Sequence, residues 1–234
     1  MKTPQQKQAF RVLAKAEWLK GYDSALAERL VSEGQFARLS TGEWAQAEGD
    51  DRSGLYVVIG GLLHTYYAPL GDRVIMVGLA EPGAVLGHAT RYSGGPRLVT
   101  AVCAEESVIL EISESALDRI AVQSPEIWRA IADLTYNNMQ RALRLAAEIV
   151  SLRPNERIAA RLVAIAKPNT SGAIPTVKIS QELLGEMVGV TRKTVNQHLS
   201  KFEQNGLIRI GYGRIDLIDI AKLELIATGH SRIG

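Results

Sequence analysis

Cysteine is nearly absent from this chain of 234 residues, which contains only Cys103. One cysteine cannot form a disulfide within the chain, and it cannot supply the several thiolates that hold an iron–sulfur cluster. The most apolar stretch, residues 55–70, is broken by Gly60, Gly61 and His64 and is shorter than the roughly 18 apolar residues of a membrane span. The amino terminus mixes charged with apolar residues, unlike a signal peptide. We therefore expect a folded, cytoplasmic protein with no membrane segment.

Motifs of common catalytic sites are also missing. The sequence has no phosphate-binding glycine loop, dinucleotide fingerprint, nucleophile elbow or paired-histidine metal motif. A strand-rich domain can resemble a metal-binding barrel enzyme, but His64 and His88 have no histidine or carboxylate companion at ligand spacing. We expect no enzyme activity, no catalytic residue, no metal and no cofactor.

Charge is unevenly distributed along the chain. Residues 1–152 carry 15 Lys and Arg against 18 Asp and Glu, a net charge of −3, whereas residues 153–234 carry 12 against 7, a net charge of +5. A basic carboxyl-terminal part suits a polyanionic partner, although a merely solvated basic surface is about as common. The position of the basic residues must distinguish these two interpretations.

The first half of the chain has the alternation of short strands separated by turn residues. The turns are expected at Gly60-Gly61, at residues 69–72, at residues 81–83 and at residues 94–96. This punctuation is typical of antiparallel hairpins in a β sandwich or barrel. The predicted strands are residues 55–59, 62–67, 74–79, 98–103 and 108–112. Cys103 falls in one of them and is expected to be a small core residue rather than a redox switch.

A long helix is predicted from residue 125, with Ser124 as its cap and Pro125 in its first turn. A nearly heptad stripe runs along it, which predicts a homodimer interface, and Asn138 is the kind of polar residue that fixes register between partner helices. Packing on its own domain is the simpler alternative. Residues 153–155 end the helix at a hinge. The stripe consists of Ile127, Ile131, Leu134, Asn138, Ala142, Leu145, Ile149 and Leu152.

After a helix over residues 156–167 and a loop over residues 168–175, two short helices joined by Gly189 predict a helix-turn-helix. Ser180 and Thr191 are the expected amino-terminal caps, and residues 207–210 and 214–218 alternate like a hairpin wing. Val195, Leu199 and Phe202 should face inward, which leaves a polar face that fits the DNA major groove. The predicted DNA-binding residues are Ser180, Thr191, Arg192, Lys193, Thr194, Asn196, Gln197 and Lys201.

The segment "ISQELLGEMVGVTRKTVNQHLSKFEQNGLI" resembles the helix-turn-helix of the Crp/Fnr superfamily of bacterial transcription regulators. "LYVVIGGLLHTYY", "EPGAVLG" and "SVILEIS" are similar, in order and spacing, to its cyclic-nucleotide-binding β-roll, and residues 124–167 resemble its dimer helix and the helix that follows. The resemblance implies an α+β fold: a β-roll of the double-stranded β-helix or jelly-roll type (1–124), a dimerisation helix (125–152) and a winged helix-turn-helix domain (153–234). It implies a homodimer that binds a palindrome in double-stranded DNA, with RNA polymerase as a further partner.

In this family a glycine, a glutamate, an arginine and a small hydroxyl residue bind cyclic AMP, and two helix positions face the adenine. The resemblance places the effector pocket here at Gly87, His88, Ala89, Arg97, Leu98, Ala142 and Leu143. His88 replaces the glutamate and Leu98 the hydroxyl residue, so we expect an effector other than cyclic AMP, or none, and we expect Arg97 to be a surface or loop ion-pair residue. A cyclic-nucleotide-responsive regulator remains an alternative. Another is a haem-based gas sensor with His64, His88 or His230 as axial ligand.

Overall fold

The computed structural model describes residues 3–51, 54–68, 74–88, 95–166 and 174–229. The chain divides into two compact units, residues 1–140 and 141–234, and each is described by itself. The helix α5 (Ile127–Ser151) crosses the boundary between them. Within the described residues, no helix combines the length and the hydropathy needed to span a membrane.

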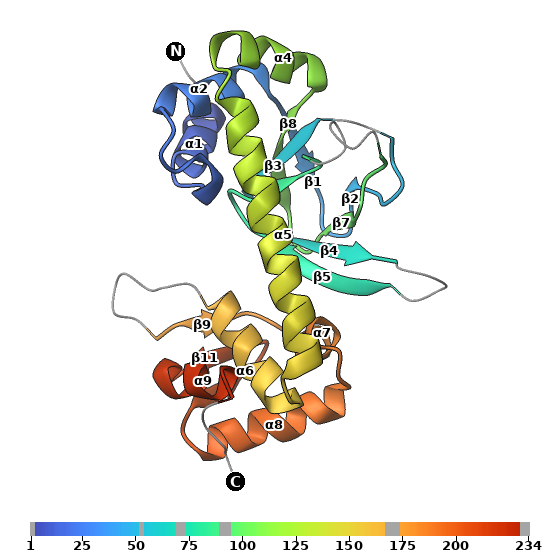
Figure 1. Cartoon of the computed structure of the whole chain (residues 1–234), viewed down its shortest axis with the longest axis vertical. Coiled ribbons are helices and arrows are strands. Elements are labelled where there is room, and N and C mark those ends of the chain that lie inside the picture. Colours follow the sequence, from blue (N-terminus) through green and yellow to red (C-terminus); the bar gives the residue numbers. More distant parts are fainter. Residues whose placement is uncertain (1–2, 52–53, 69–73, 89–94, 167–173, 230–234) are drawn as a thin grey trace. The chain divides into compact units, whose positions relative to one another are not determined.

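The strands of the first unit form two antiparallel sheets (Figure 1). Strand neighbours are mostly not consecutive in the chain, as the predicted β-roll requires. All five predicted strands are present, and Cys103 is buried as expected, at 2% exposure. One sheet has the order β1 (Gln35–Leu39), β8 (Ser107–Ile112), β3 (Leu55–Gly60), β6 (Val85–Leu86). The other has the order β2 (Trp44–Gln46), β7 (Thr100–Cys103), β4 (Leu63–Tyr67), β5 (Ile75–Ala80).

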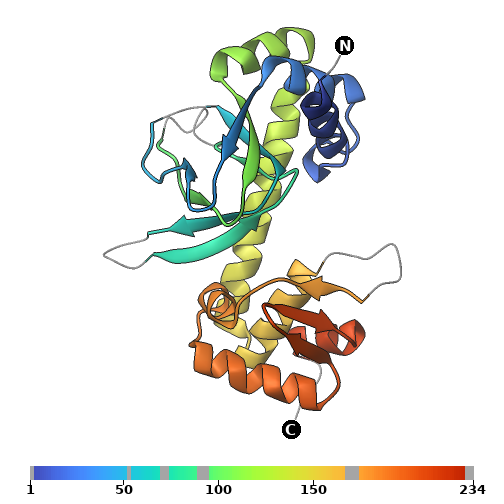
Figure 2. The same ribbon diagram turned by 180° about the vertical axis from the view of Figure 1, so that it is seen from behind.

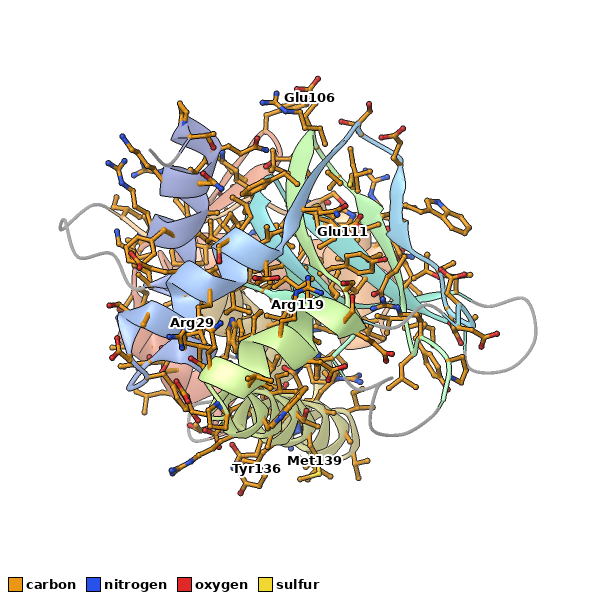
Figure 3. The ribbon with its side chains drawn as sticks, turned by 90° about the horizontal axis from the view of Figure 1, so that it is seen from above. Arg29, Glu106, Glu111, Arg119, Tyr136 and Met139 are labelled. Carbon is orange, nitrogen blue, oxygen red and sulfur yellow. The ribbon has the colours of Figure 1, made fainter. Side chains whose placement is uncertain are left out.

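Helices from both ends of the first unit share one hydrophobic core with the strands. The amino-terminal helices, which the sequence did not predict, contribute Ala9, Leu13, Leu26 and Leu30 to this core. In Figure 3, Arg119 of α4 (Glu114–Gln123) lies beside α2 (Ser24–Glu33), where its Nε donates to the carboxylate of Glu33 at 2.8 Å. The helices are α1 (Pro4–Leu13), the short 3₁₀ helix η1 (Glu17–Leu19), α2 (Ser24–Glu33), α4 (Glu114–Gln123) and the first part of α5.

The junction between α4 and α5 is built differently from the prediction. Ser124 is fully buried, and its hydroxyl contacts the guanidinium of Arg29, which also donates to the carbonyl of Gln123 at 2.9 Å. The amide of Ile127 bonds to the carbonyl of Ser124, at 3.1 Å. The backbone of Ser124 therefore serves the start of α5, while its side chain holds the amino-terminal helices.

The second unit is a winged helix domain (Figure 2). The predicted helices and the hairpin wing are present, and the structure adds two elements that the sequence did not predict, β9 and α9. The strand β9 pairs with β11 and widens the wing into a three-stranded sheet. The elements are α6 (Pro154–Ile165), β9 (Thr176–Val177), α7 (Gln181–Val188), α8 (Arg192–Gln204), β10 (Ile208–Gly211), β11 (Arg214–Leu217) and α9 (Ile220–Ala227).

Candidate DNA-binding face and effector pocket

Side-chain caps hold the two helices of the helix-turn-helix in place. The hydroxyl of Ser180 accepts from the amide of Leu183 at 3.1 Å at the start of α7. Gly189 ends that helix in the left-handed conformation, with φ of 67°, which glycine adopts without strain. Thr191 caps α8 by accepting from the amide of Thr194 at 3.2 Å. These local bonds explain why so short a segment folds into two helices with a sharp turn.

The helix α8 has one buried face and one polar face, as predicted. Val195, Leu199 and Phe202 are at most 1% exposed. The opposite side carries hydrogen-bonding and cationic groups with their polar ends in solvent, namely Arg192, Lys193, Asn196, Gln197 and Lys201. Thr194 is half-buried, and its hydroxyl lies 2.9 Å from that of Thr191. The buried face fixes which side chains a nucleic acid could reach.

The sequence did not identify four further residues of this domain. Arg209, Tyr212 and Arg214 of the wing are exposed, and His198 of α8 is half-buried. Tyr212 is fully exposed at the wing tip, between Arg209 on β10 and Arg214 on β11. The signal was present in the sequence, because an aromatic residue between two glycines and near two arginines is unusual in a simple solvated turn. His198 of α8 is half-buried, and burial, with a smaller effect of Lys201, lowers its pKa.

Arg97 lies inside the roll, so the prediction of a surface position is wrong, whereas the loop position is as predicted. Only 1% of Arg97 is exposed. Its Nη1 donates to the side-chain oxygen of Gln46 at 2.9 Å, and its guanidinium carbon lies 4.5 Å from the centre of the Tyr56 ring. A β-carbon at Gly87, whose φ is 77°, would lie 1.4 Å from Nη1. Glycine is therefore required at position 87, because the guanidinium occupies the space of a side chain.

His88 is bound to the long helix of its own domain. Its Nε2 lies 3.2 Å from the side-chain amide nitrogen of Asn138 on α5. Burial, and then the positive charge of Arg97, lower the pKa of His88 to about 4, so the ring is neutral at physiological pH. The amide of Asn138 then donates to Nε2, which places the ring hydrogen on Nδ1.

Of the other predicted pocket residues, only Leu98 is described within the first unit. Leu98 is 64% exposed. Ala142 and Leu143 are exposed on the part of α5 that belongs to the second unit, and Ala89 lies outside the described residues. The structure thus brings Gly87 together with Arg97, and His88 together with Asn138.

The first part of the predicted dimer stripe has a partner within its own chain. Ile127, Ile131 and Leu134 are buried in the core of the first unit, so for this part of the stripe the alternative of packing on its own domain holds. Asn138 bonds to His88, while Leu145 and Leu152 are half-buried and Ile149 is 48% exposed.

A second apolar stripe on α5 is exposed. In Figure 3, Tyr136 and Met139 point away from the strands of their unit, and they are 55% and 51% exposed. The stripe is spaced by alternately four and three residues along the helix. It consists of Ala132, Tyr136, Met139, Leu143, Ala146 and Val150. This exposed stripe, one residue away from the predicted one, has the period of a coiled-coil seam.

Similarity to known proteins agrees with both parts of this fold. The family model for the cyclic nucleotide-binding domain matches residues 36–124, and that for the Crp-like helix-turn-helix domain matches residues 156–226. The CRP-like cAMP-activated global transcriptional regulator of Mycobacterium tuberculosis is 25% identical over 208 residues, which cover 85% of this chain and 91% of that protein. The nitrogen fixation regulation protein FixK of Bradyrhizobium diazoefficiens is 25% identical over 212 residues, with coverages of 88% and 87%. The chain belongs to the Crp/Fnr family of transcription regulators.

Solved structures show the same fold as this Crp/Fnr regulator. The global regulator CLP of Xanthomonas campestris, which is described as c-di-GMP responsive, aligns with a TM-score of 0.70 and 22% identity over 83% of this chain and 99% of that chain.

His64 and His88 of this Crp/Fnr chain each contact a neighbouring side chain. The hydroxyl of Tyr66 lies 3.4 Å from Nδ1 of His64, and burial lowers the pKa of His64. His88 contacts Asn138, and His230 lies outside the described residues. Among the described residues, no three His, Cys, Asp or Glu side chains gather where a metal ion could bind.

Proposed function

We propose that this Crp/Fnr regulator binds a palindromic operator as a homodimer, with α8 of each subunit in the major groove. The observation that carries the proposal is that α8 has a buried apolar face and an exposed polar face. Its apolar side chains are locked into the domain core, while a row of cationic and amide side chains is held in solvent at a helix that is capped at its start. Such a helix fits the major groove, where base edges can be distinguished.

The polar residues of α8 take different roles. Arg192 and Lys193 can donate to guanine, and Asn196 and Gln197 can pair with adenine. Ser180, Thr191, Thr194 and Lys201 are assigned to phosphates, which fix the position of the helix without selecting sequence. Tyr212, Arg209 and Arg214 extend this surface onto the wing.

The homodimer forms through the exposed stripe of α5. Tyr136, Met139, Leu143 and Val150 present apolar area that their own subunit leaves in water, and their spacing allows two copies of α5 to pack as a coiled coil. The proposed domain organisation is a sensor roll in residues 1–124, a dimerisation helix in residues 125–152 and a DNA-binding domain in residues 153–234.

Cyclic AMP does not control this protein in our proposal. Arg97, which stands at the position of the arginine that binds cyclic AMP in the family, contacts Gln46 and Tyr56, and His88 contacts Asn138. A nucleotide would have to break these contacts and would find Leu98 in place of a hydroxyl. Each polar group left buried without a partner costs about 1 to 3 kcal/mol, which outweighs one retained phosphate contact. The protein acts without catalysis, in the cytoplasm, together with RNA polymerase.

The experiment that tests DNA binding is selection of bound sequences from random DNA by the full chain. Fluorescence anisotropy then measures affinity for the selected operator and for a scrambled duplex. Gln197→Ala should cost about 1 to 3 kcal/mol on the operator and leave scrambled DNA unchanged. Gln204→Ala changes the same residue type at an exposed site at the end of α8 and should alter neither affinity. Enrichment of no sequence would contradict the proposal.

Calorimetric titration of the dimer with cyclic AMP tests the sensor. Binding at micromolar concentration or tighter, together with stronger operator binding, would restore the alternative of a cyclic-nucleotide-responsive regulator. The relative that is named as cAMP-activated makes this the first ligand to examine.

A further inference from the structure

The helix α5 presents two different faces within a single turn. Successive helical residues are separated by about 100°, so Leu134 and Asn138 lie on one side and Tyr136 and Met139 lie on the other. Leu134 is buried in the core of the first unit and Asn138 bonds to His88, whereas Tyr136 and Met139 point away from the strands (Figure 3). Any rotation of α5 about its axis would therefore move both faces together.

The bond between His88 and Asn138 is a polar contact between α5 and the strand region of the first unit, and the hydroxyl of Tyr22 donates to the carboxylate of Asp133 elsewhere on the helix, at 2.6 Å. Hydrophobic contacts such as those of Leu134 hold a helix against a sheet but resist a small rotation weakly, because they are not directional. A hydrogen bond is directional and weakens steeply when its angle departs from linearity. At 3.2 Å between Nε2 and the amide nitrogen, this bond ties the rotation of α5 to the position of one ring.

The His88 ring is itself anchored from inside the roll. The preceding residue, Gly87, adopts a φ of 77° and packs directly against the guanidinium of Arg97. That guanidinium is held by Gln46 of β2 and lies over the ring of Tyr56 of β3. A continuous set of contacts thus leads from both sheets of the roll through Arg97, Gly87 and His88 to Asn138.

We infer that His88 and Asn138 are positioning residues that fix the rotation of α5 and thereby direct Tyr136 and Met139 toward the second subunit without a bound ligand. This inference rests on the proposed homodimer. In it, the chain's own histidine supplies the link between the roll and the dimer helix. The protein then binds its operator in the absence of any effector.

Cross-linking measures the rotation directly. Cysteine is introduced at Met139 or, in a separate protein, at Gln140, which lies one residue along the exposed side of α5. Cys103 is buried and burial raises its pKa, so the introduced thiol is the reactive one. In the otherwise unchanged chain, a short bifunctional maleimide should link Met139→Cys between subunits much faster than Gln140→Cys.

Asn138→Leu removes the bond while keeping the size of the side chain and a good helix former. It should reduce the preference for cross-linking at position 139 and weaken operator binding by roughly three- to tenfold, the range expected for one hydrogen bond. Asn137→Leu, the same change at the neighbouring residue, is the matched control and should do neither. His88→Gln keeps an acceptor near the position of Nε2 and should retain operator affinity within about twofold.

His88→Leu should weaken operator binding as Asn138→Leu does, and the double variant should lose no more than either single one, because both changes remove the same bond. Additive losses, or an unchanged cross-linking preference and affinity in Asn138→Leu, overturn the inference. If Asn138→Leu does not fold, Asn138→Ala is judged by the same outcomes. Failure of the unchanged chain to dimerise or to select an operator would instead overturn the proposed function.

Discussion

Replacing His88 by glutamine should make the stability of the protein less sensitive to acid. The pKa of this histidine is lowered from 6.5 to about 4 by burial and by Arg97. Below pH 6.5 the unfolded chain binds a proton at His88 that the folded chain does not bind until the pH approaches 4. Stability therefore falls as the pH decreases through this window, and it is unaffected above it.

The magnitude follows from the size of the shift. A difference of about 2.5 pH units, at about 1.4 kcal/mol per unit, corresponds to a loss of about 3 kcal/mol between pH 7.5 and pH 4. Glutamine cannot take up a proton, so the variant lacks this loss. Burial also lowers the pKa of His64 and His198, but both remain in the two proteins and cancel in the difference.

Urea denaturation at a fixed protein concentration, repeated between pH 7.5 and pH 4.5, measures the effect. The free energies of unfolding of the unchanged protein and of His88→Gln should converge as the pH falls, or cross if the variant is less stable at pH 7.5. Two curves that stay parallel from pH 7.5 to 4.5 would show that His88 titrates normally in the folded chain, and the buried, neutral ring described above would be refuted.

Gly87→Ala should lower the free energy of unfolding by at least about 1 to 2 kcal/mol, measured by urea denaturation, because alanine is strained at a φ of 77° and its β-carbon would overlap the guanidinium of Arg97. An unchanged midpoint would show that Arg97 lies elsewhere. Thr191→Ala should lower the free energy of unfolding by about 1 kcal/mol, because α8 loses its cap. In fluorescence anisotropy it should weaken binding to the operator and to scrambled DNA by the same factor. Met139→Asp should raise the dimer dissociation constant in sedimentation, whereas Ile131→Val, a change in the core of one subunit, should not; a stable dimer of Met139→Asp would exclude the exposed stripe.

The helix-turn-helix could be predicted from sequence because its signals are local. The cap hydrogen bonds of the two helices join groups only three residues apart, at Ser180, Gly189 and Thr191. The spacing of the buried side chains Val195, Leu199 and Phe202 is that of a single helix. The roll was partly predictable for the same reason, since turn residues next to each other in the sequence separate most of its strands. The strands β1, β2 and β6 were missed, and length alone does not explain the case of β1, because β4 and β7, with five and four residues, were predicted.

The sequence could not show which face of α5 packs on the first unit, because both faces of the helix are apolar. Periodicity shows that Ile131 and Leu134 share a face, and equally that Tyr136 and Met139 do, but not which face the domain covers. The position of Arg97 could not be predicted either. Whether its charge lies inside depends on Gln46 and Tyr56, which are about 40 to 50 residues away in the sequence.

The amino-terminal helices lie outside the region that matches the family model, but they share the hydrophobic core of the first unit. The match to the family model of the cyclic nucleotide-binding domain begins at residue 36, but the hydrophobic core of the first unit begins with Ala9 and Leu13. Those early side chains pack with Ile127 and Ile131 of α5, more than a hundred residues later. A chain shortened to begin at residue 36 would leave the inner side of α5 uncovered, so residues 3–35 belong to the same folded unit as the strands even though the family model does not include them.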